Sequence, residues 1–470
     1  MPHHVKQTNQ QGQEAATVSQ QSYPQREPPA AEHFPSGSSS SQRSTTAAGG
    51  GARMGFQLFV VYANLAMYAF CFQMQQPVLP ATVKALVVGD DSAQEWAQFQ
   101  SMNGMMQLGG GLVSGVLADK FGSKNLLLLS FAASALCYLL QAQATTMNML
   151  YVSQIPTVFQ HAFMGAAAFI TDRTEPKERA HMLGFNAVAY GVGMLFGPVL
   201  GGWLGQTDLT TSAWIAAVGS VLSCASIQLL LSDERKFTPS SKASEPPEPF
   251  SLAACLAVIT QPAVLVLAAI KVGGAMAMSI WHSTFYGGIA ESEFGIDTQM
   301  LGVLTSYMAA VGMVVQVCGL VKYVTGAASD RTINIAVGCM LAVVFLAAPL
   351  TTAGKDTPVV VPVVGYTTNL ACLQFMGLLI PITAAFTLIR SISTAQFTKS
   401  VSKATTGTII GIDMGIGSAV RIFAPLIGGA VQGEGGLTAI AQLCAALCVV
   451  MAVLSALMMD AAAPDKAKQG

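Results

Sequence analysis

Charged side chains are scarce in this chain. Of its 470 residues, 10% are Asp, Glu, Lys or Arg, whereas an ordinary soluble domain has about 25%. At the same time 52% of the residues are hydrophobic. A soluble protein of this length could not cover its surface with so few charges. The composition therefore argues against a soluble enzyme and predicts an integral membrane protein that crosses the bilayer several times.

Signals for several other functions are also missing. The formal net charge of −1 argues against a nucleic-acid partner. The nine cysteines lie in apolar runs, and no Cys-x-x-Cys spacing indicates a metal site or a disulfide framework. No Gly-x-x-x-x-Gly-Lys-Ser/Thr loop is present to cradle phosphates, which argues against transport driven by ATP. We therefore expect no cofactor, no metal and no ATP.

Twelve apolar segments are each close to the roughly 20 residues that a membrane helix needs. They are 56–76, 97–118, 125–143, 147–171, 180–204, 211–231, 262–289, 299–321, 332–351, 368–395, 404–431 and 437–459. The polar, low-complexity stretch 1–54 is predicted to be a disordered tail, and 461–470 a second tail. A charged, proline-rich linker at 232–251 would separate six-helix bundles at 55–231 and 252–460, with a short interfacial helix at 252–261.

The two halves share a glycine-rich pattern. Gly184–Gly202 and Gly407–Gly429 are similar runs in which Gly184 and Gly411, and Pro198 and Pro425, stand 227 positions apart. Glycines are poor residues for a helix in water, but in a bilayer they let helix backbones approach closely. A membrane helix repeated at half the chain length predicts two similar halves, which is the plan of a transporter.

The basic residues predict the orientation, because cytosolic loops are enriched in Lys and Arg. If the N-terminus is cytosolic, the linker and the loops on that side carry twelve basic residues. These are Lys120, Lys124, Arg173, Lys177, Arg179, Arg235, Lys236, Lys242, Lys322, Arg331, Lys399 and Lys403. The opposite side carries only Lys84 and Lys355. We therefore expect both termini in the cytosol; the sequence does not identify the membrane.

One loop carries a family motif. Gly115–Lys124 (GVLADKFGSK) joins the second and third spans and resembles the Gly-x-x-x-Asp-x-x-Gly-x-Lys loop of the major facilitator superfamily. Gly115 would permit close helix contact and Gly122 a tight turn, while Asp119 and Lys124 would bond to neighbouring helix ends. The alternative is an ordinary charged turn, but its position after the second span favours the family motif.

A second resemblance concerns the fifth span. Its Gly and Pro residues resemble the antiporter motif of the drug/proton antiporter branch: Gly184, Gly193, Gly197, Pro198, Gly201 and Gly202. The preceding Ile170–Arg179 resembles the matching loop of tetracycline exporters, in which Asp172 closes one helix and Arg179 opens the next. Most of 56–459 resembles the tetracycline-transporter-like, organic-cation-transporter-like branch of solute carrier family 22.

These resemblances imply an all-α fold of twelve transmembrane helices in two pseudo-symmetric six-helix bundles. They also imply a monomeric secondary transporter that exports small amphipathic organic molecules or cations in exchange for protons. One departure weakens the proton scheme: many relatives carry an Arg in the fourth span, where this chain has Gln154. Alternatives are a uniporter or symporter of a metabolite, and a transport-inactive relative that acts as a sensor or scaffold.

Four charged residues lie well inside predicted spans: Lys271, Arg390, Asp413 and Arg421. A charge at bilayer depth costs at least ~2.5 kcal/mol, so we expect these residues to line a watery path or to pair with one another. The alternatives are ion pairs that lock helices together and long side chains that reach the interface.

Asp413 is the acid best placed to couple a proton to transport, and Asn186 occupies its matching place in the first half. Burial disfavours the charged form of a carboxyl group and a neighbouring cation favours it. His161 and His282 titrate near neutral pH and are further candidates for carrying protons, although a lone histidine in a helix is more often a hydrogen-bonded interior residue.

Overall fold

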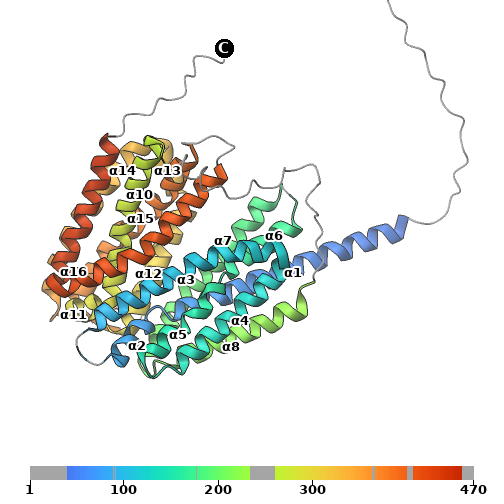
Figure 1. Cartoon of the computed structure of the whole chain (residues 1–470), viewed down its shortest axis with the longest axis horizontal. Coiled ribbons are helices and arrows are strands. Elements are labelled where there is room, and N and C mark those ends of the chain that lie inside the picture. The colour runs from blue at the N-terminus through green and yellow to red at the C-terminus, as the bar shows by residue number, and fades with distance from the viewer. Residues whose placement is uncertain are drawn as a thin grey trace, which may run out of the picture. The chain divides into compact units, whose positions relative to one another are not determined.

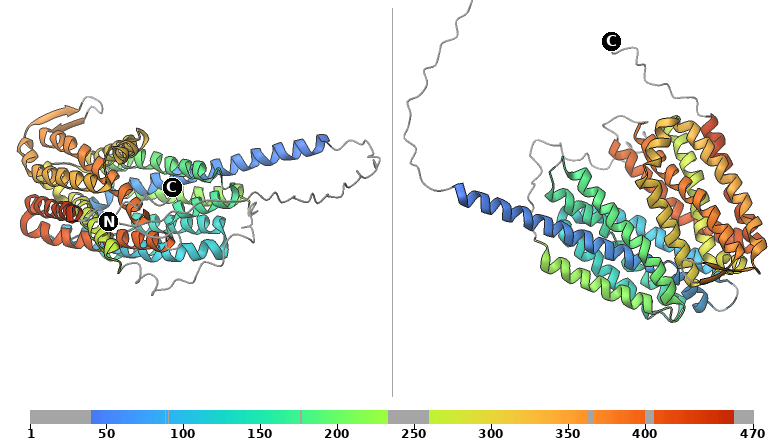
Figure 2. Two further views of the ribbon diagram at one scale, coloured as in Figure 1. Left: turned by 90° about the horizontal axis from the view of Figure 1, so that it is seen from above. Right: turned by 180° about the vertical axis from the view of Figure 1, so that it is seen from behind.

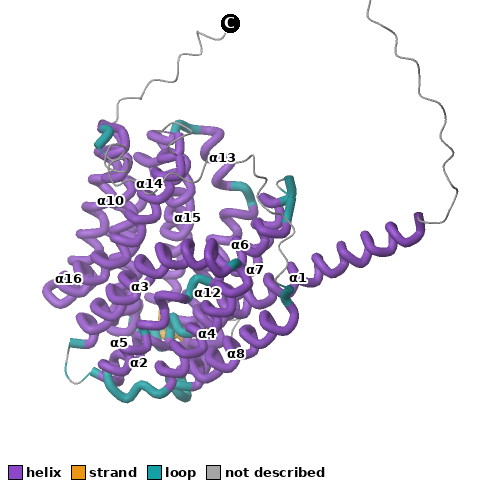
Figure 3. Tube along the Cα trace, turned by 45° about the vertical axis from the view of Figure 1, so that its right-hand side comes forward, coloured by secondary structure: helices purple, strands orange, loops and turns teal. Residues whose placement is uncertain are grey.

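The computed structural model describes residues 40–87, 89, 91–175, 177–232, 260–361, 366–399 and 406–457. From Arg53 on, the described residues belong to one compact unit. Nearly all of what is described is helix (Figure 3). The predicted tail at 461–470 and nearly all of the predicted linker and interfacial helix at 232–261 lie outside the described residues.

Most helices of the first half follow the predicted spans closely, and the first and fourth spans depart from them. They are α1 (Ser40–Met74), α2 (Val78–Leu86), α3 (Ser92–Phe121), α4 (Ser123–Ala142), α5 (Met147–Ser153), the 3-10 helix η1 (Ile155–Phe159), α6 (Ala162–Arg173), α7 (Arg179–Gly205) and α8 (Thr211–Leu230). Figure 1 shows α3, α4, α7 and α8 running side by side in one bundle.

Helix α1 begins inside the stretch predicted to be disordered. It starts at Ser40, so helical backbone covers residues 40–54 of this stretch. No proline occurs between Pro35 and Pro77, and a helix is ended most strongly by proline. The remainder of the predicted tail, residues 1–39, lies outside the described residues.

The fourth span consists of three pieces, whereas the sequence predicts one continuous helix. Helix α5 gives way to η1 at Ile155 and the chain turns again before α6. Pro156 stands at the start of η1, and proline supplies no N–H for the helical ladder. His161 therefore lies at the break, directly before α6, rather than inside a helix.

The second half contains helices, a π-helical turn and a small hairpin. Its elements are α10 (Pro262–Thr284), the π turn η2 (Phe285–Ile289), α11 (Ala290–Phe294), α12 (Thr298–Val317), α13 (Leu320–Ala327), α14 (Asp330–Ala347), the 3-10 helix η3 (Ala348–Gly354), β1 (Pro358–Val361), β2 (Tyr366–Asn369), α15 (Leu370–Lys399) and α16 (Thr406–Leu457). The strands pair antiparallel, with Pro358 opposite Asn369, and lie at one end of this bundle (Figure 2).

The count of twelve spans agrees with the described helices. Nine of these are long and apolar enough to cross a membrane. One of the nine, α16, contains two predicted spans, because it bends at Gly436, whose φ is 57°. Two predicted spans are not among the nine. One is the broken fourth span, and the other is α3, which its glutamines and glycines make less apolar.

The glycines of α7 face two different helices. A Cβ on Gly197 would lie 2.6 Å from the Phe70 carbonyl oxygen of α1, and one on Gly201 would collide with the Met74 carbonyl oxygen. One on Gly202 would instead lie 2.6 Å from the Thr298 carbonyl oxygen of α12, in the second half. Such contacts need a residue without a side chain. Gly184 has no such neighbour within 4 Å.

Polar contacts join the two halves at the end that carries α2 and α11. Lys84 pairs with Glu291 at 2.7 Å. The Gln206 amide donates to Asp297 at 2.8 Å, and the Trp96 indole donates to the Ser283 carbonyl oxygen at 2.9 Å. We call this the outer end, because it lies opposite the predicted cytosolic loops. The halves are therefore closed against each other there.

Several glycines toward the opposite end of the same helices meet no neighbour. A Cβ added at Gly111 or Gly115 of α3, or at Gly411 or Gly415 of α16, would find no other atom within 4 Å. The close contact predicted for Gly115 is therefore absent from this structure. At these four positions the backbone of α3 and α16 is therefore not covered by another helix.

The two kinds of glycine predict opposite effects of one added methyl group. Gly201→Ala should lower the free energy of unfolding by about 1–3 kcal/mol, because the methyl group collides with the backbone of α1. Gly184→Ala should leave it unchanged or raise it by up to about 1 kcal/mol, because alanine favours a helix. Thermal unfolding of the two purified variants checks this. Equal losses in both would contradict the packing described.

Candidate functional site

An ion pair joins two of the four charged residues predicted inside spans. The Lys271 ammonium of α10 bonds to Oδ1 of Asp413, near the start of α16. Their side chains are 15% and 10% exposed. Because a buried charge is costly when it has no partner, each residue of the pair stabilises the charged form of the other.

Two neighbours on α15 complete the surroundings of this pair. The Thr394 hydroxyl donates to the other carboxylate oxygen of Asp413 at 3.1 Å, and the Lys271 ammonium lies 5.7 Å from the centre of the Phe397 ring. Sequence analysis missed Thr394, because a threonine in a helix ordinarily bonds to its own backbone. Thr394 also lies 3.4 Å from the Arg390 carbonyl oxygen, one turn back.

The remaining two charged residues, Arg390 and Arg421, lie on α15 and α16, and both are exposed. Arg421 donates to the Ser418 hydroxyl at 3.2 Å. Among the described residues, no carboxylate lies within ion-pair distance of either guanidinium.

The facing region of the first half is polar but uncharged. Gln154 occupies the place where many relatives were expected to carry Arg, and its oxygen accepts a hydrogen bond from Asn103 of α3 at 2.9 Å. His161 packs against Gly110 of α3, and its Nε2 is buried without a hydrogen-bond partner in the described structure. Asn186, the counterpart of Asp413, is likewise buried with both polar atoms unpaired among the described residues.

His282 lies elsewhere, toward the outer end of α10. Its ring packs against Tyr286, with centroids 4.5 Å apart. Among the described residues, neither His282 nor His161 forms a hydrogen bond or an ion pair with Lys271 or Asp413. Both histidines remain candidates for proton transfer on sequence grounds alone.

The loops opposite the outer end link helix ends within each half. In the first half Gly122 makes a turn with φ of 86°, as predicted, and the Ser123 hydroxyl donates to Asp172 at 2.8 Å. Arg179 opens α7, also as predicted. Asp119 is exposed, whereas Lys124 has a partner.

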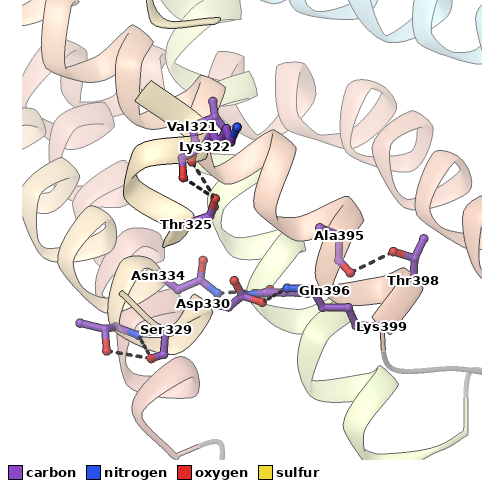
Figure 4. Close-up of polar contacts among 11 residues, drawn as sticks. Val321, Lys322, Thr325, Ser329, Asp330, Asn334, Ala395, Gln396, Thr398 and Lys399 are labelled. Carbon is purple, nitrogen blue, oxygen red and sulfur yellow. Dashed lines mark hydrogen bonds and ion pairs between the residues drawn. The ribbon is translucent and has the colours of Figure 1, made fainter. Parts of the chain in front are cut away.

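The second half repeats this link with different residues. Lys399 at the end of α15 pairs with Asp330 at the start of α14 at 2.9 Å, and the Asn334 amide donates to Gln396 at 3.3 Å (Figure 4). In both halves a bond therefore connects the start of the third helix to the end of the fourth. The Asp330 pair is largely exposed, and such pairs contribute about 0–1 kcal/mol.

A cleft of about 1000 Å³ opens at the outer end. Residues of both halves line it, among them Lys84, Trp96, Tyr286 and Glu291. The four charged residues inside the spans do not line this cleft. The cleft at the outer end and the region of the four charged residues are therefore two different places in the structure.

Comparison with known proteins finds relatives in the families that the sequence motifs resemble. The family model of the Major Facilitator Superfamily matches residues 61–423. The chain is 26% identical over 382 residues to mouse solute carrier family 22 member 18, covering 79% of this chain and 88% of that protein. It is 26% identical over 279 residues to the class C tetracycline resistance protein of Escherichia coli, covering 58% and 67%. These matches confirm both predicted resemblances.

Solved structures show the same fold. The human organic anion transporter MFSD10 (TETRAN) is similar with a TM-score of 0.55 at 16% identity, covering 85% of this chain and 98% of that one. The nucleoside transporter NupG is similar with a TM-score of 0.64 at 13% identity, covering 85% and 98%. At this identity the likeness supports the twelve-helix architecture and not a substrate.

Proposed function

The chain belongs to the major facilitator superfamily, so it is a membrane transporter and not an enzyme, and we propose that it exports a small amphipathic organic molecule in exchange for protons. The proposed driving force is a proton gradient, because the sequence holds no phosphate-cradling loop for ATP. The proposed working form is a monomer with both termini in the cytosol.

One observation carries the proton coupling. Asp413 is the one acid of the described spans that lies away from a helix end and a loop, and it bonds at once to Lys271 and Thr394. A carboxylate in such a place gains or loses a proton with a large change in its surroundings. Protonation would remove the charge that Lys271 pairs with and would weaken the hydrogen bond from Thr394.

The pair connects three helices that have to move in alternating access. Lys271 lies on α10, Thr394 on α15 and Asp413 on α16. In this structure the pair is formed while the halves are closed at the outer end. In the proposal, the protonated and ionised forms of Asp413 favour different packings of these helices, and the transported molecule shifts the same balance.

Two other functions remain as candidates. A uniporter or symporter of a metabolite would use the same fold with a different coupling. A transport-inactive relative would bind its ligand without moving it, and in it the Lys271–Asp413 pair would only hold α16 to α10. The first of these receives support from Gln154, since the first half lacks the expected arginine.

The proposed orientation predicts which positions an impermeant reagent reaches. Ser292→Cys at the outer end should react with an impermeant maleimide in sealed cells, whereas Lys177→Cys should react only after the membrane is opened. Both positions are exposed, so access depends on the side of the membrane and not on burial. Reaction of Lys177→Cys in sealed cells would reverse the orientation.

The coupling role predicts the behaviour of Asp413→Asn, which keeps the size and removes the charge. Purified chain in proteoliposomes should move tetracycline, or another compound of an organic-molecule panel, faster under an imposed pH gradient. Asp413→Asn should lose this dependence, because no group at this site then gains or loses a proton. Uptake with and without the gradient measures it.

Asp330→Asn is the matched control, because it also breaks an Asp–Lys pair but at an exposed helix end. It should keep the gradient dependence. Wild-type rate and pH profile in Asp413→Asn would refute the coupling role. If only the amount of folded protein fell, and Asp413→Asn with Lys271→Gln restored it, the pair would be a static link.

A further inference from the structure

The charges inside the second half do not balance. Lys271, Arg390 and Arg421 carry three positive charges, and Asp413 carries one negative charge. The Lys271–Asp413 ion pair accounts for one of each. Two positive charges remain on Arg390 and Arg421, for which the described residues provide no carboxylate. Arginine stays protonated in proteins, so these charges are not removed by titration.

Both arginines lie beside the ion pair, on its outer side. Arg390 on α15 stands one turn before Thr394, which bonds to Asp413 of α16. Arg421 stands about two turns beyond Asp413 on α16. Its backbone packs against Gly104 on α3, where an added Cβ would lie 2.9 Å from the Arg421 carbonyl carbon. Both arginines therefore lie between the ion pair and the outer end, on two helices that meet at Thr394 and Asp413.

The first half offers this region no negative charge. Its acidic residues stand at helix ends or in loops, such as Glu95 and Asp119 at the two ends of α3 and Asp172 near the end of α6. Between them the facing polar side chains are neutral, including Asn103 and Gln154. Two like charges among apolar helices repel each other more strongly than in water, because the surroundings have a low dielectric constant.

Both guanidinium side chains nevertheless remain exposed. An arginine that only held helices together would be expected to have its donors occupied by carboxylates or carbonyl oxygens. The single hydrogen bond described for Arg421 goes to the Ser418 hydroxyl, one turn away on its own helix. Most of the ten N–H donors that two guanidinium groups present are thus available to a ligand.

We propose that Arg390 and Arg421 bind the negatively charged group of the transported molecule, and that the substrate is therefore an amphipathic organic anion with a carboxylate or sulfonate. This inference rests on the proposed transport function and names its substrate class. The oxygens of such a group accept paired hydrogen bonds from the planar guanidinium.

This assignment differs from the organic cations implied by the resemblance to solute carrier family 22. A cation entering the region would meet two uncompensated positive charges, whereas an anion neutralises them. The substrate also brings the charge that the helices lack, so the loaded site would be close to neutral while the empty one is not. Binding of the anion and protonation of Asp413 would thus alter the charge of the same group of helices.

Thermal unfolding of the purified full-length chain tests the proposal without measuring transport. The probes are 4-phenylbutyrate and naphthalene-2-sulfonate, with benzyltrimethylammonium as an aromatic cation of similar size. The anions should raise the unfolding temperature in a saturable way, and the cation should not. Stabilisation by the cation alone, or by none of the three probes, would overturn the proposal.

Arg390→Gln and Arg421→Gln should each weaken binding of the anions about tenfold or more, the usual size of a hydrogen bond to a charged group. Without ligand these variants should unfold at or above the wild-type temperature, because one of two repelling charges is gone. A merely structural arginine would give a lower temperature instead. Lys322→Gln removes an equal charge from exposed α13 and should leave anion binding unchanged. Anion affinity unchanged in both arginine variants would refute the site.

Failure of the anion site can be distinguished from failure of the proposed transport function. If the arginine variants lose anion binding but wild-type protein shows no transport under a pH gradient, the anion site stands and proton-coupled export fails. If gradient-driven transport of a cation persists at full rate in Arg390→Gln and Arg421→Gln, the export function stands and the anion site fails.

Discussion

An unpaired charge among apolar helices costs free energy, and this cost limits where the charged residues of the chain can lie. The chain has few charged residues, and nearly all of them lie in loops and at helix ends. The four exceptions are all in the second half. Lys271 and Asp413 offset this cost by forming an ion pair. Arg390 and Arg421 have no carboxylate within ion-pair distance among the described residues. Apolar helices that keep such residues have to place them next to a partner, a proton or a ligand, and that requirement links the fold to transport.

Close helix packing sets the state in which these charges are seen. Without side chains at Gly197 and Gly201, α7 lies directly against α1, and Gly202 brings it against α12 of the other half. Together with the Lys84–Glu291 pair, these contacts close the outer end. Four glycines toward the other end of α3 and α16 have no neighbour within 4 Å, Gly115 among them. A backbone surface without side chains is available there, and it is of the kind that packs tightly at the outer end.

Much of this architecture could be predicted from the sequence, because bilayer thickness fixes the length of each apolar span and uncompensated charge inside a span is rare. The same reasoning singled out Lys271 and Asp413 as possible partners. It could not find Thr394, whose hydroxyl reaches Asp413 only through packing of α15 on α16. It also missed the break after α5, since one proline does not reveal whether a membrane helix kinks or is interrupted. Gly184 fits the antiporter pattern, but which glycine meets another helix depends on the conformation.

The central claim is that the charge of Asp413 controls the packing of the two halves. Electron paramagnetic resonance distances between spin labels at Lys177→Cys and Lys322→Cys, one in each half, test it directly; Cys318→Ser and Cys339→Ser remove the exposed native thiols of the described chain. At neutral pH, Asp413→Asn should shift the distance distribution away from that of the wild type, because the charge that pairs with Lys271 is gone. The control Asp330→Asn should leave the distribution unchanged. The same distance distribution in Asp413→Asn as in the wild type would contradict the account.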